Sequence, residues 1–162
     1  MSVYPQKRVK ILGFRYESDL HLMRNIEAVQ RRQGDDALYV VARDYSSTVI
    51  VREGREEKPL NIVVPCCFLT DLASVPKWAR AISGIGRVGP HLEASVIHDW
   101  LYAAWQHEDV TPVKRMRRFA DQVFRQAMLE AGADEVSLIY NAVRAGGETA
   151  FFAKDELLFD PR

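Results

Sequence analysis

A histidine, an aspartate and a tyrosine stand together as H-D-x-x-Y at His98, Asp99 and Tyr102, in a segment rich in apolar residues. If this segment is a helix, residues four apart share a face, so His98 and Tyr102 lie one above the other. A buried histidine or aspartate needs a polar partner. The pattern therefore allows two interpretations. In the first, His98 acts as a general base or a metal ligand, and Asp99 is a ligand of a hard cation. In the second, His98 is a histidine of the core and Asp99 is a surface aspartate.

A second carboxylate that would complete such a site is Asp121, in the segment RRFADQVFRQAM. The apolar residues of this segment recur at helical spacing, and Asp121 lies at the edge of the stripe that they form. A carboxylate that faced His98 from a neighbouring helix would fix the tautomer of the imidazole and stabilise its charged form. The alternative is an aspartate exposed to solvent.

Three hydrogen-bonding residues precede these helices in the junction FLTDLASVP: Thr70, Asp71 and Ser74. Asp71 would bring a further carboxylate toward Asp99, where the two could hold a divalent cation. Thr70 and Ser74 are then candidates for binding a substrate or partner. Alternatively, Asp71 or Ser74 simply caps the helix that is expected to begin at Pro76.

Further candidate contacts lie at the starts of the two helices. His91 precedes His98 by about two helical turns, and a pair of imidazoles would suit zinc, whereas carboxylates and carbonyls suit calcium. The run 114–118 places four cations at the start of a helix, against its dipole. We interpret Arg117 and Arg118 as candidate contacts for phosphate, lipid head groups or an acidic partner, with a solvated helix face as the alternative.

The elements that must position these residues divide the chain into two halves. Hydrophobic periodicity predicts strands at 10–14, 37–51 and 60–68 with a turn at 52–58, and helices at 19–31, 76–82, 91–106, 112–131 and 134–145. Thr111 is the expected N-cap of the helix before Gly132. The predicted fold class is α+β, with a small antiparallel sheet in the N-terminal half packed on a helical C-terminal half. We expect one domain over 1–162, whose apolar segment 148–162 packs on the body or on a partner.

Composition limits the classes of function. The chain has 162 residues, and its 22 Lys and Arg balance 22 Asp and Glu, so it has no global attraction for nucleic acid and we expect no specific nucleic-acid partner. Cys66 and Cys67 are adjacent, and we expect reduced thiols buried in a strand. We predict no signal peptide and no transmembrane segment, and therefore synthesis in the cytoplasm.

Four blocks in order resemble one known family: F-x-T-D-L-A-S-V-P, A-x-x-x-H-D-W-L-Y, R-x-x-A-D-x-x-F-x-x-A-M and A-V-R-x-G-G. The family is the domain of unknown function 1353, found in bacteriophages and prophages, and the resemblance covers roughly residues 60–147. It implies a phage setting, with synthesis in the host cytoplasm and the virion as a candidate location. The family name implies no established activity.

The H-D-x-x-Y helix and the D-x-x-F context of Asp121 also resemble the helix pair of bacterial secretory phospholipases of the A-two class. In those enzymes the histidine activates water, the adjacent aspartate binds calcium, and an aspartate of the second helix orients the histidine. The resemblance implies these roles for His98, Asp99 and Asp121, with Tyr102 as a supporting hydrogen-bond donor. This chain lacks the cysteines that tie those helices, and it lacks their glycine-rich calcium loop at a matching offset unless the glycine-containing segment 84–89 replaces that loop.

Two functions follow as hypotheses. The first is a metal-dependent hydrolase of a host-envelope substrate, lipid or peptidoglycan, with calcium as the first choice of cation and zinc as the second. Its catalytic residues would be His98, Tyr102 and Asp121, and its metal ligands Asp99 and Asp71. The second is a non-catalytic virion or tail protein, structural or for assembly, which binds other virion proteins and uses the same residues as a buried polar network.

Overall fold

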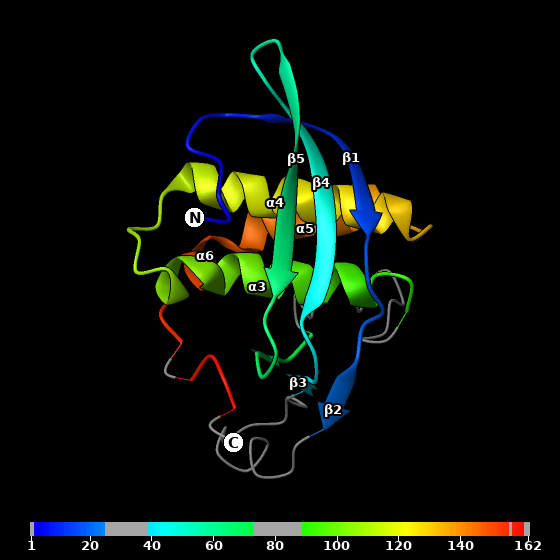
Figure 1. Ribbon diagram of the computed structural model, residues 1–162, viewed down its shortest axis with the longest axis vertical. Coiled ribbons are helices and arrows are strands. Elements are labelled where there is room, and N and C mark those ends of the chain that lie inside the picture. The colour runs from blue at the N-terminus through cyan, green and yellow to red at the C-terminus, as the bar shows by residue number, and fades with distance from the viewer. Residues whose placement is uncertain (1, 25–38, 73–88, 156, 161–162) are drawn as a thin grey trace.

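The computed structural model describes residues 2–24, 39–72, 89–155 and 157–160. These residues form two small antiparallel sheets in the N-terminal half and a set of helices in the C-terminal half (Figure 1). The predicted α+β fold class is confirmed.

The larger sheet has the strand order β1-β4-β5. Its strands are β1 (Lys10–Tyr16), β4 (Tyr45–Glu53) and β5 (Glu56–Val64). β4 and β5 form a hairpin whose turn uses Gly54 at φ +64°, a backbone conformation that glycine adopts without steric cost. β5 begins earlier than predicted and ends before Pro65, which cannot donate a ladder hydrogen bond.

The smaller sheet joins β2 (Leu22–Arg24), β3 (Tyr39–Val41) and β6 (Leu69–Thr70) in the order β2-β3-β6. This smaller sheet shows that two predictions from the sequence were wrong. Residues 22–24 of the helix predicted at 19–31 are a strand, because they pair with β3, and residues 25–31 lie outside the described part of the chain. The single strand predicted at 37–51 is divided between β3 and β4, which belong to different sheets.

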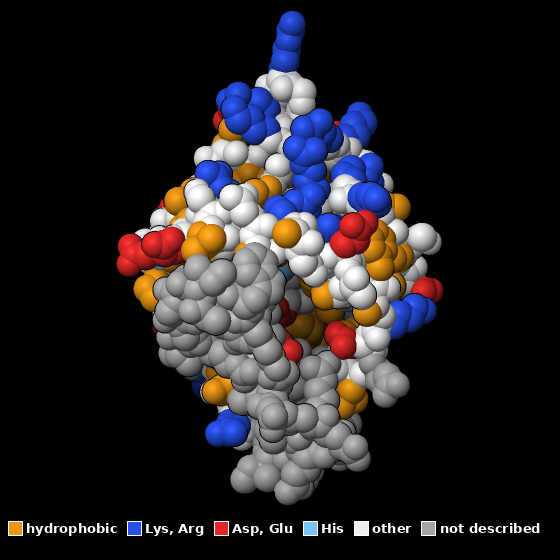
Figure 2. Space-filling model, turned by 180° about the vertical axis from the view of Figure 1, so that it is seen from behind, with side chains coloured by type: hydrophobic (Ala, Val, Ile, Leu, Met, Phe, Trp, Pro, Cys, Tyr) orange, Lys and Arg blue, Asp and Glu red, His pale blue; other side chains and the backbone are white. Residues whose placement is uncertain are grey.

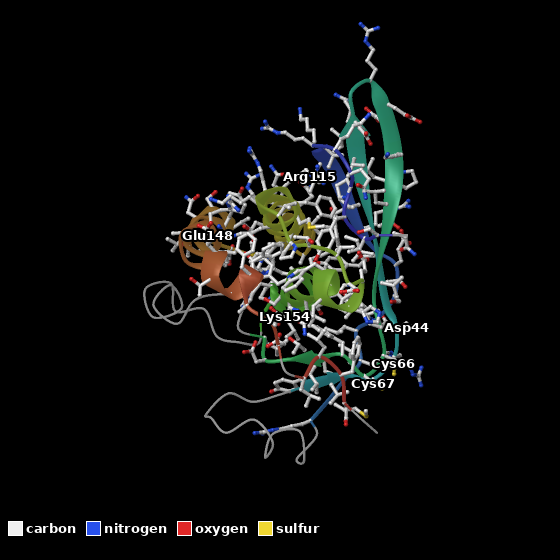
Figure 3. All side chains as sticks on the ribbon, turned by 90° about the vertical axis from the view of Figure 1, so that its left-hand side faces the viewer. Asp44, Cys66, Cys67, Arg115, Glu148 and Lys154 are labelled. Carbon is white, nitrogen blue, oxygen red and sulfur yellow. The ribbon has the colours of Figure 1, made fainter. Side chains whose placement is uncertain are left out.

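The helices form two layers on one side of the larger sheet (Figure 3). They are α3 (Leu92–His107), α4 (Lys114–Glu130), α5 (Val136–Gly146) and α6 (Glu148–Phe152). α4 packs on β1 and α3 on β5, while α5 packs on α4 and α6 on α3. The inner helices α3 and α4 therefore have neighbours on both sides, which explains why polar residues on them are buried.

The ends of the helices agree only in part with the ends predicted from the sequence. α4 ends next to Gly132, which has φ +68° as expected for a helix stop. Its N-cap is Val113 rather than Thr111, and the helix predicted at 76–82 lies outside the described residues. No helix in the described ranges has the length and apolar content to cross a membrane.

Cys66 and Cys67 lie in the connection between β5 and β6, and not in a strand (Figure 3). Both are free thiols, as expected, but Cys66 is exposed and Cys67 is half-buried. The prediction that they are buried was therefore wrong for Cys66. Pro65 ends the strand just before the pair, so the thiols fall on an irregular surface segment.

The C-terminal segment packs on the body. Phe151 is fully buried, and its carbonyl accepts a hydrogen bond of 3.0 Å from the indole Nε1 of Trp105. Phe159 forms an isolated β-bridge with Phe68, and the Leu158 carbonyl accepts from the backbone N–H of Leu69 at 2.9 Å. The segment thus closes over β6, next to the site described below.

Candidate functional site

α3 and α4 bring His98 and Asp121 into direct contact. His98 Nε2 lies 2.8 Å from Asp121 Oδ1, and both residues are buried, with 2% and 0% of their surfaces exposed. The antiparallel packing of two helices joined by a short connection accounts for this meeting. The sequence suggested this contact without being able to establish it.

Tyr102 adds a second hydrogen bond to the same oxygen. Its hydroxyl donates to Asp121 Oδ1 at 2.7 Å, and its ring lies 4.2 Å from the His98 ring, between centroids. Burial raises the pKa of Tyr102 above its usual range, and the negative charge of Asp121 raises it further. Tyr102 therefore remains protonated and acts as a donor.

The other oxygen of Asp121 faces two arginines. Arg144 of α5 donates from Nη1 to Asp121 Oδ2 at 2.6 Å, and Arg117 Nε lies 3.7 Å from the same oxygen. Burial alone would raise the pKa of Asp121, but the hydrogen bonds from His98, Tyr102 and Arg144 outweigh it and lower the pKa below its ordinary value. Asp121 is therefore a carboxylate at neutral pH, although it is fully buried.

An ionised Asp121 decides which nitrogen of neutral His98 carries the hydrogen. A carboxylate only accepts, so Nε2 must donate to it, and Nδ1 keeps the lone pair. Asp121 is the only hydrogen-bond partner of the His98 ring within the described ranges. This tautomer makes Nδ1 a potential proton acceptor, held in orientation by Asp121.

His98 lies in the wall of a pocket of about 420 Å³, and Figure 2 shows the hollowed face of the molecule. The described residues that line it come from the segment before α3 and from α3, α5 and the C-terminal segment: Phe68, Leu69, Thr70, Asp71, His98, Asp99, Tyr102, Val143, Gly146, Gly147, Ala150, Ala153 and Asp155. Apolar side chains and carboxylates both contribute to the wall. Such a pocket has the size and the mixed lining of a small-molecule site.

Asp99 and Asp71 line the same pocket. Thr70 Oγ1 donates to Asp99 Oδ2 at 2.5 Å and accepts from the backbone N–H of Leu72 at 3.2 Å, so Thr70 links the Asp99 carboxylate to the backbone after β6. In the described ranges, no three His, Cys, Asp or Glu residues gather closely enough to bind a metal by themselves. Zinc takes three or four such ligands, whereas calcium also accepts carbonyl oxygens and water.

The remaining predicted site residues lie elsewhere. His91 is buried at the N-cap of α3, and the described lining of the pocket contains His98 but not His91. Ser74 lies outside the described residues. Arg117 is buried, and its Nη2 donates to the carbonyls of Val143 at 3.2 Å and of Arg144 at 2.6 Å, so its guanidinium is engaged inside the fold. Arg118 is exposed.

Sequence reasoning missed two members of the site, Arg144 and Gly147. Arg144 binds Asp121, and Gly147 lies where α5 meets α6, against Tyr102. Both belong to the block A-V-R-x-G-G, so a signal was present, but nothing local shows that this block returns to α3 and α4. Arg117 also had a signal, because it precedes Asp121 by four residues and therefore shares its helix face.

The sequence model of the family described as "Protein of unknown function (DUF1353)" matches residues 50–143. The match covers more than half of the 162 residues and includes His98, Tyr102 and Asp121. A search of the curated proteins and a search of the solved structures each find no match. The chain is therefore a member of the DUF1353 family.

Proposed function

We propose that this protein is a hydrolase in which His98 is the general base and Asp121 is its orienting group. The observation that carries the proposal is the 2.8 Å contact between His98 Nε2 and Asp121 Oδ1 in the wall of a pocket. A histidine that is held by a carboxylate through one nitrogen and is left basic at the other is the arrangement that general-base catalysis requires. The resemblance of H-D-x-x-Y and D-x-x-F to the phospholipase helix pair points in the same direction.

The proposed reaction is ester hydrolysis by direct attack of water. His98 Nδ1 takes one proton from a water molecule, whose oxygen forms a bond to the ester carbonyl carbon. Asp121 stabilises the imidazolium that results, as the acidic member of a catalytic triad does. When the tetrahedral intermediate collapses, the C–O bond to the alcohol breaks and the imidazolium returns the proton to the leaving alkoxide.

Asp99 and Asp71 are the residues that would hold a divalent cation, with calcium preferred because they are hard oxygen ligands. When bound, such a cation would supply charge stabilisation for the carbonyl oxygen of the substrate. Thr70 supports this role because its hydroxyl donates a hydrogen bond to Oδ2 of Asp99 and so fixes the orientation of the carboxylate. The two carboxylates and the basic nitrogen of His98 would then act on the same substrate group.

We propose a phospholipid of the host envelope, in a phage setting, as the substrate. The apolar residues Phe68, Leu69, Val143 and Ala150 in the pocket wall suit an acyl chain. Peptidoglycan, a polar polymer of sugars and short peptides, would make little use of this apolar wall. The phage setting rests on the family resemblance of the sequence.

The test is fatty-acid release from vesicles of phosphatidylglycerol and phosphatidylethanolamine, with calcium or with a chelator. The wild type should release fatty acid in the presence of calcium. His98→Asn should reduce the rate at least about a hundredfold, which is the lower end of the contribution that a general base makes to the rate. The matched control is His21→Asn, which replaces an exposed histidine directly before β2 and should keep full activity. Peptidoglycan is run in parallel.

Three results would contradict the proposal: no release from either substrate, equal rates for wild type and a folded His98→Asn, or turnover of peptidoglycan alone. The first, together with a loss of stability in His98→Asn, would favour the alternative proposal. In that alternative, the protein is a non-catalytic virion or tail component whose buried polar network joins α3, α4 and α5.

A further inference from the structure

Two adjoining hollows lie away from the pocket of His98, where β1 and β4 meet α4 and α5. They have volumes of about 400 and 450 Å³ and share Lys10 and Gln122 in their linings. The side chains of both linings are mostly polar: Arg8, Val9, Lys10, Ile11, Arg52, Gln122, Arg125, Gln126, Ser137, Tyr140 and Asn141, with Gly54. We call this continuous depression the basic groove.

The charges in the basic groove have one sign. Its described lining contains four cations and no carboxylate. Arg8, Lys10 and Arg125 are exposed and form no ion pair with any described residue, whereas Arg52 pairs with Glu57. The guanidinium of Arg125 lies over the Tyr140 ring, 5.8 Å from its centroid, which holds it at the groove without neutralising it.

The exposed face of α4 extends this charge. Arg115, Arg118, Gln122 and Arg125 follow one another at helical spacing, and Arg115 and Arg118 also lack an ion pair within the described ranges. Figure 2 shows Lys and Arg side chains gathered toward the end of the molecule that carries the β4–β5 turn, and Figure 3 places Arg115 on that side of α4. In a chain of formal net charge zero, this segregation creates a local positive field that attracts anions.

We propose that the basic groove binds the sugar–phosphate backbone of a single nucleic-acid strand without sequence preference. Cations that form no ion pair with a described residue supply the attraction for phosphates, and the amides of Gln122, Gln126 and Asn141 can donate hydrogen bonds to phosphate and sugar oxygens. A flexible single strand can bend so that successive phosphates reach the cations of both hollows. The balanced total charge predicted no global attraction for nucleic acid, and the groove is the kind of local patch that non-specific binding would need.

The groove fits an anionic membrane less well. A protein that docks on a bilayer adds apolar side chains that enter the interface. The exposed large apolar residues in the described ranges are Met23, Val113, Leu129 and Phe152, and none of them lines the basic groove. The proposal is independent of the hydrolase function, because no residue of the groove lines the pocket of His98.

The test measures binding of a fluorescent 20-nucleotide oligothymidylate to the full chain by anisotropy, between 50 and 300 mM salt. Wild type should bind at low salt and weaken as salt rises. The triple variant Arg8→Gln, Lys10→Gln, Arg125→Gln should bind at least tenfold more weakly at low salt. For this variant, the slope of log affinity against log salt concentration should be smaller in magnitude by about 2, as expected when three phosphate contacts to a single strand are lost.

The matched control is the triple variant Arg15→Gln, Arg43→Gln, Lys154→Gln, which removes the same charge from exposed positions outside both linings. It should bind within about twofold of wild type. Equal weakening in both triple variants would overturn the proposal, as would the absence of binding at 50 mM salt. Binding to phosphatidylglycerol vesicles that depends on the groove, without binding to the oligonucleotide, would assign the groove to a membrane and would also overturn it.

Discussion

The hydroxyl of Tyr102 lies in the space that a β-carbon on Gly147 would occupy. Such a carbon would come within 2.6 Å of the hydroxyl and 2.8 Å of the Val143 carbonyl oxygen. The same hydroxyl donates to Asp121, so the absence of a side chain at Gly147 allows the junction of α5 and α6 to close on the buried carboxylate. A residue that carries no functional group is therefore part of what positions the site.

Gly147→Ala should lower the free energy of unfolding by about 1–3 kcal/mol, because the added methyl group overpacks a site where a backbone carbonyl cannot move away. Urea denaturation followed by circular dichroism measures the change. Gly13→Ala is the control, since its β-carbon would meet no described atom closer than 3.8 Å, and it should cost less than about 1 kcal/mol. Equal effects of the two substitutions would show that the Tyr102 contact does not require glycine.

Arg117 and Arg118 are adjacent and chemically identical, but only Arg117 is buried. Arg117→Gln should lower the free energy of unfolding by about 2–4 kcal/mol, because it leaves two carbonyls and part of Asp121 without their cationic donor. Arg118→Gln should change it by less than about 0.5 kcal/mol. The same denaturation experiment compares the two, and similar values would contradict the assignment of Arg117 to the interior.

Asp121 should make stability depend on pH in the acid range. Its pKa in the folded protein is below the ordinary value, so its stabilisation is complete above about pH 4 and is lost as the pH falls through the folded value. Asp121→Asn should cost about 3 kcal/mol at pH 7, and its difference from wild type should shrink below pH 4. Thermal unfolding between pH 2.5 and 8 measures this. Asp134→Asn, at an exposed aspartate, should follow wild type throughout, and a constant difference for Asp121→Asn would contradict the prediction.

Calcium should stabilise the protein if Asp99 and Asp71 hold it. At about 100 times the dissociation constant, a ligand that binds only the folded state adds about 2.7 kcal/mol, which corresponds to a rise in Tm of about 5–10 °C for a domain of this size. Asp99→Asn should abolish the rise, and Asp134→Asn should keep it. The absence of any rise with wild type would remove calcium from the proposed mechanism and leave His98 and Asp121 to act without it.

Parts of the site could be predicted from the sequence because they depend on local periodicity. His98 and Tyr102 are four residues apart on one helix, and Asp121 stands at the edge of an apolar stripe, so their faces follow from helix geometry. Arg117 was assigned to the surface because it stands in a run of cations. Its position four residues before Asp121 carried the opposite information.

Other parts depend on contacts between distant segments, which periodicity does not contain. Residues 22–24 have helical spacing but pair with β3, because strand pairing is a tertiary property. Arg144 and Gly147 reach the site only because α5 and α6 fold back on α3 and α4. The basic groove is likewise assembled from four separate elements, so a balanced total charge gave no indication of it.

The central claim is that Asp121 fixes the tautomer of His98, so that the uncharged ring has its hydrogen on Nε2 and its lone pair on Nδ1. Long-range ¹H–¹⁵N NMR of the histidine side chains at pH 8 measures this directly, with the His98 signals assigned by their loss in His98→Asn. We predict a protonated Nε2 and an unprotonated Nδ1 for His98, and a change in this pattern in Asp121→Asn. A hydrogen on Nδ1 in the wild-type protein, with Nε2 unprotonated, would contradict the account, because His98 would then have no basic nitrogen available for catalysis.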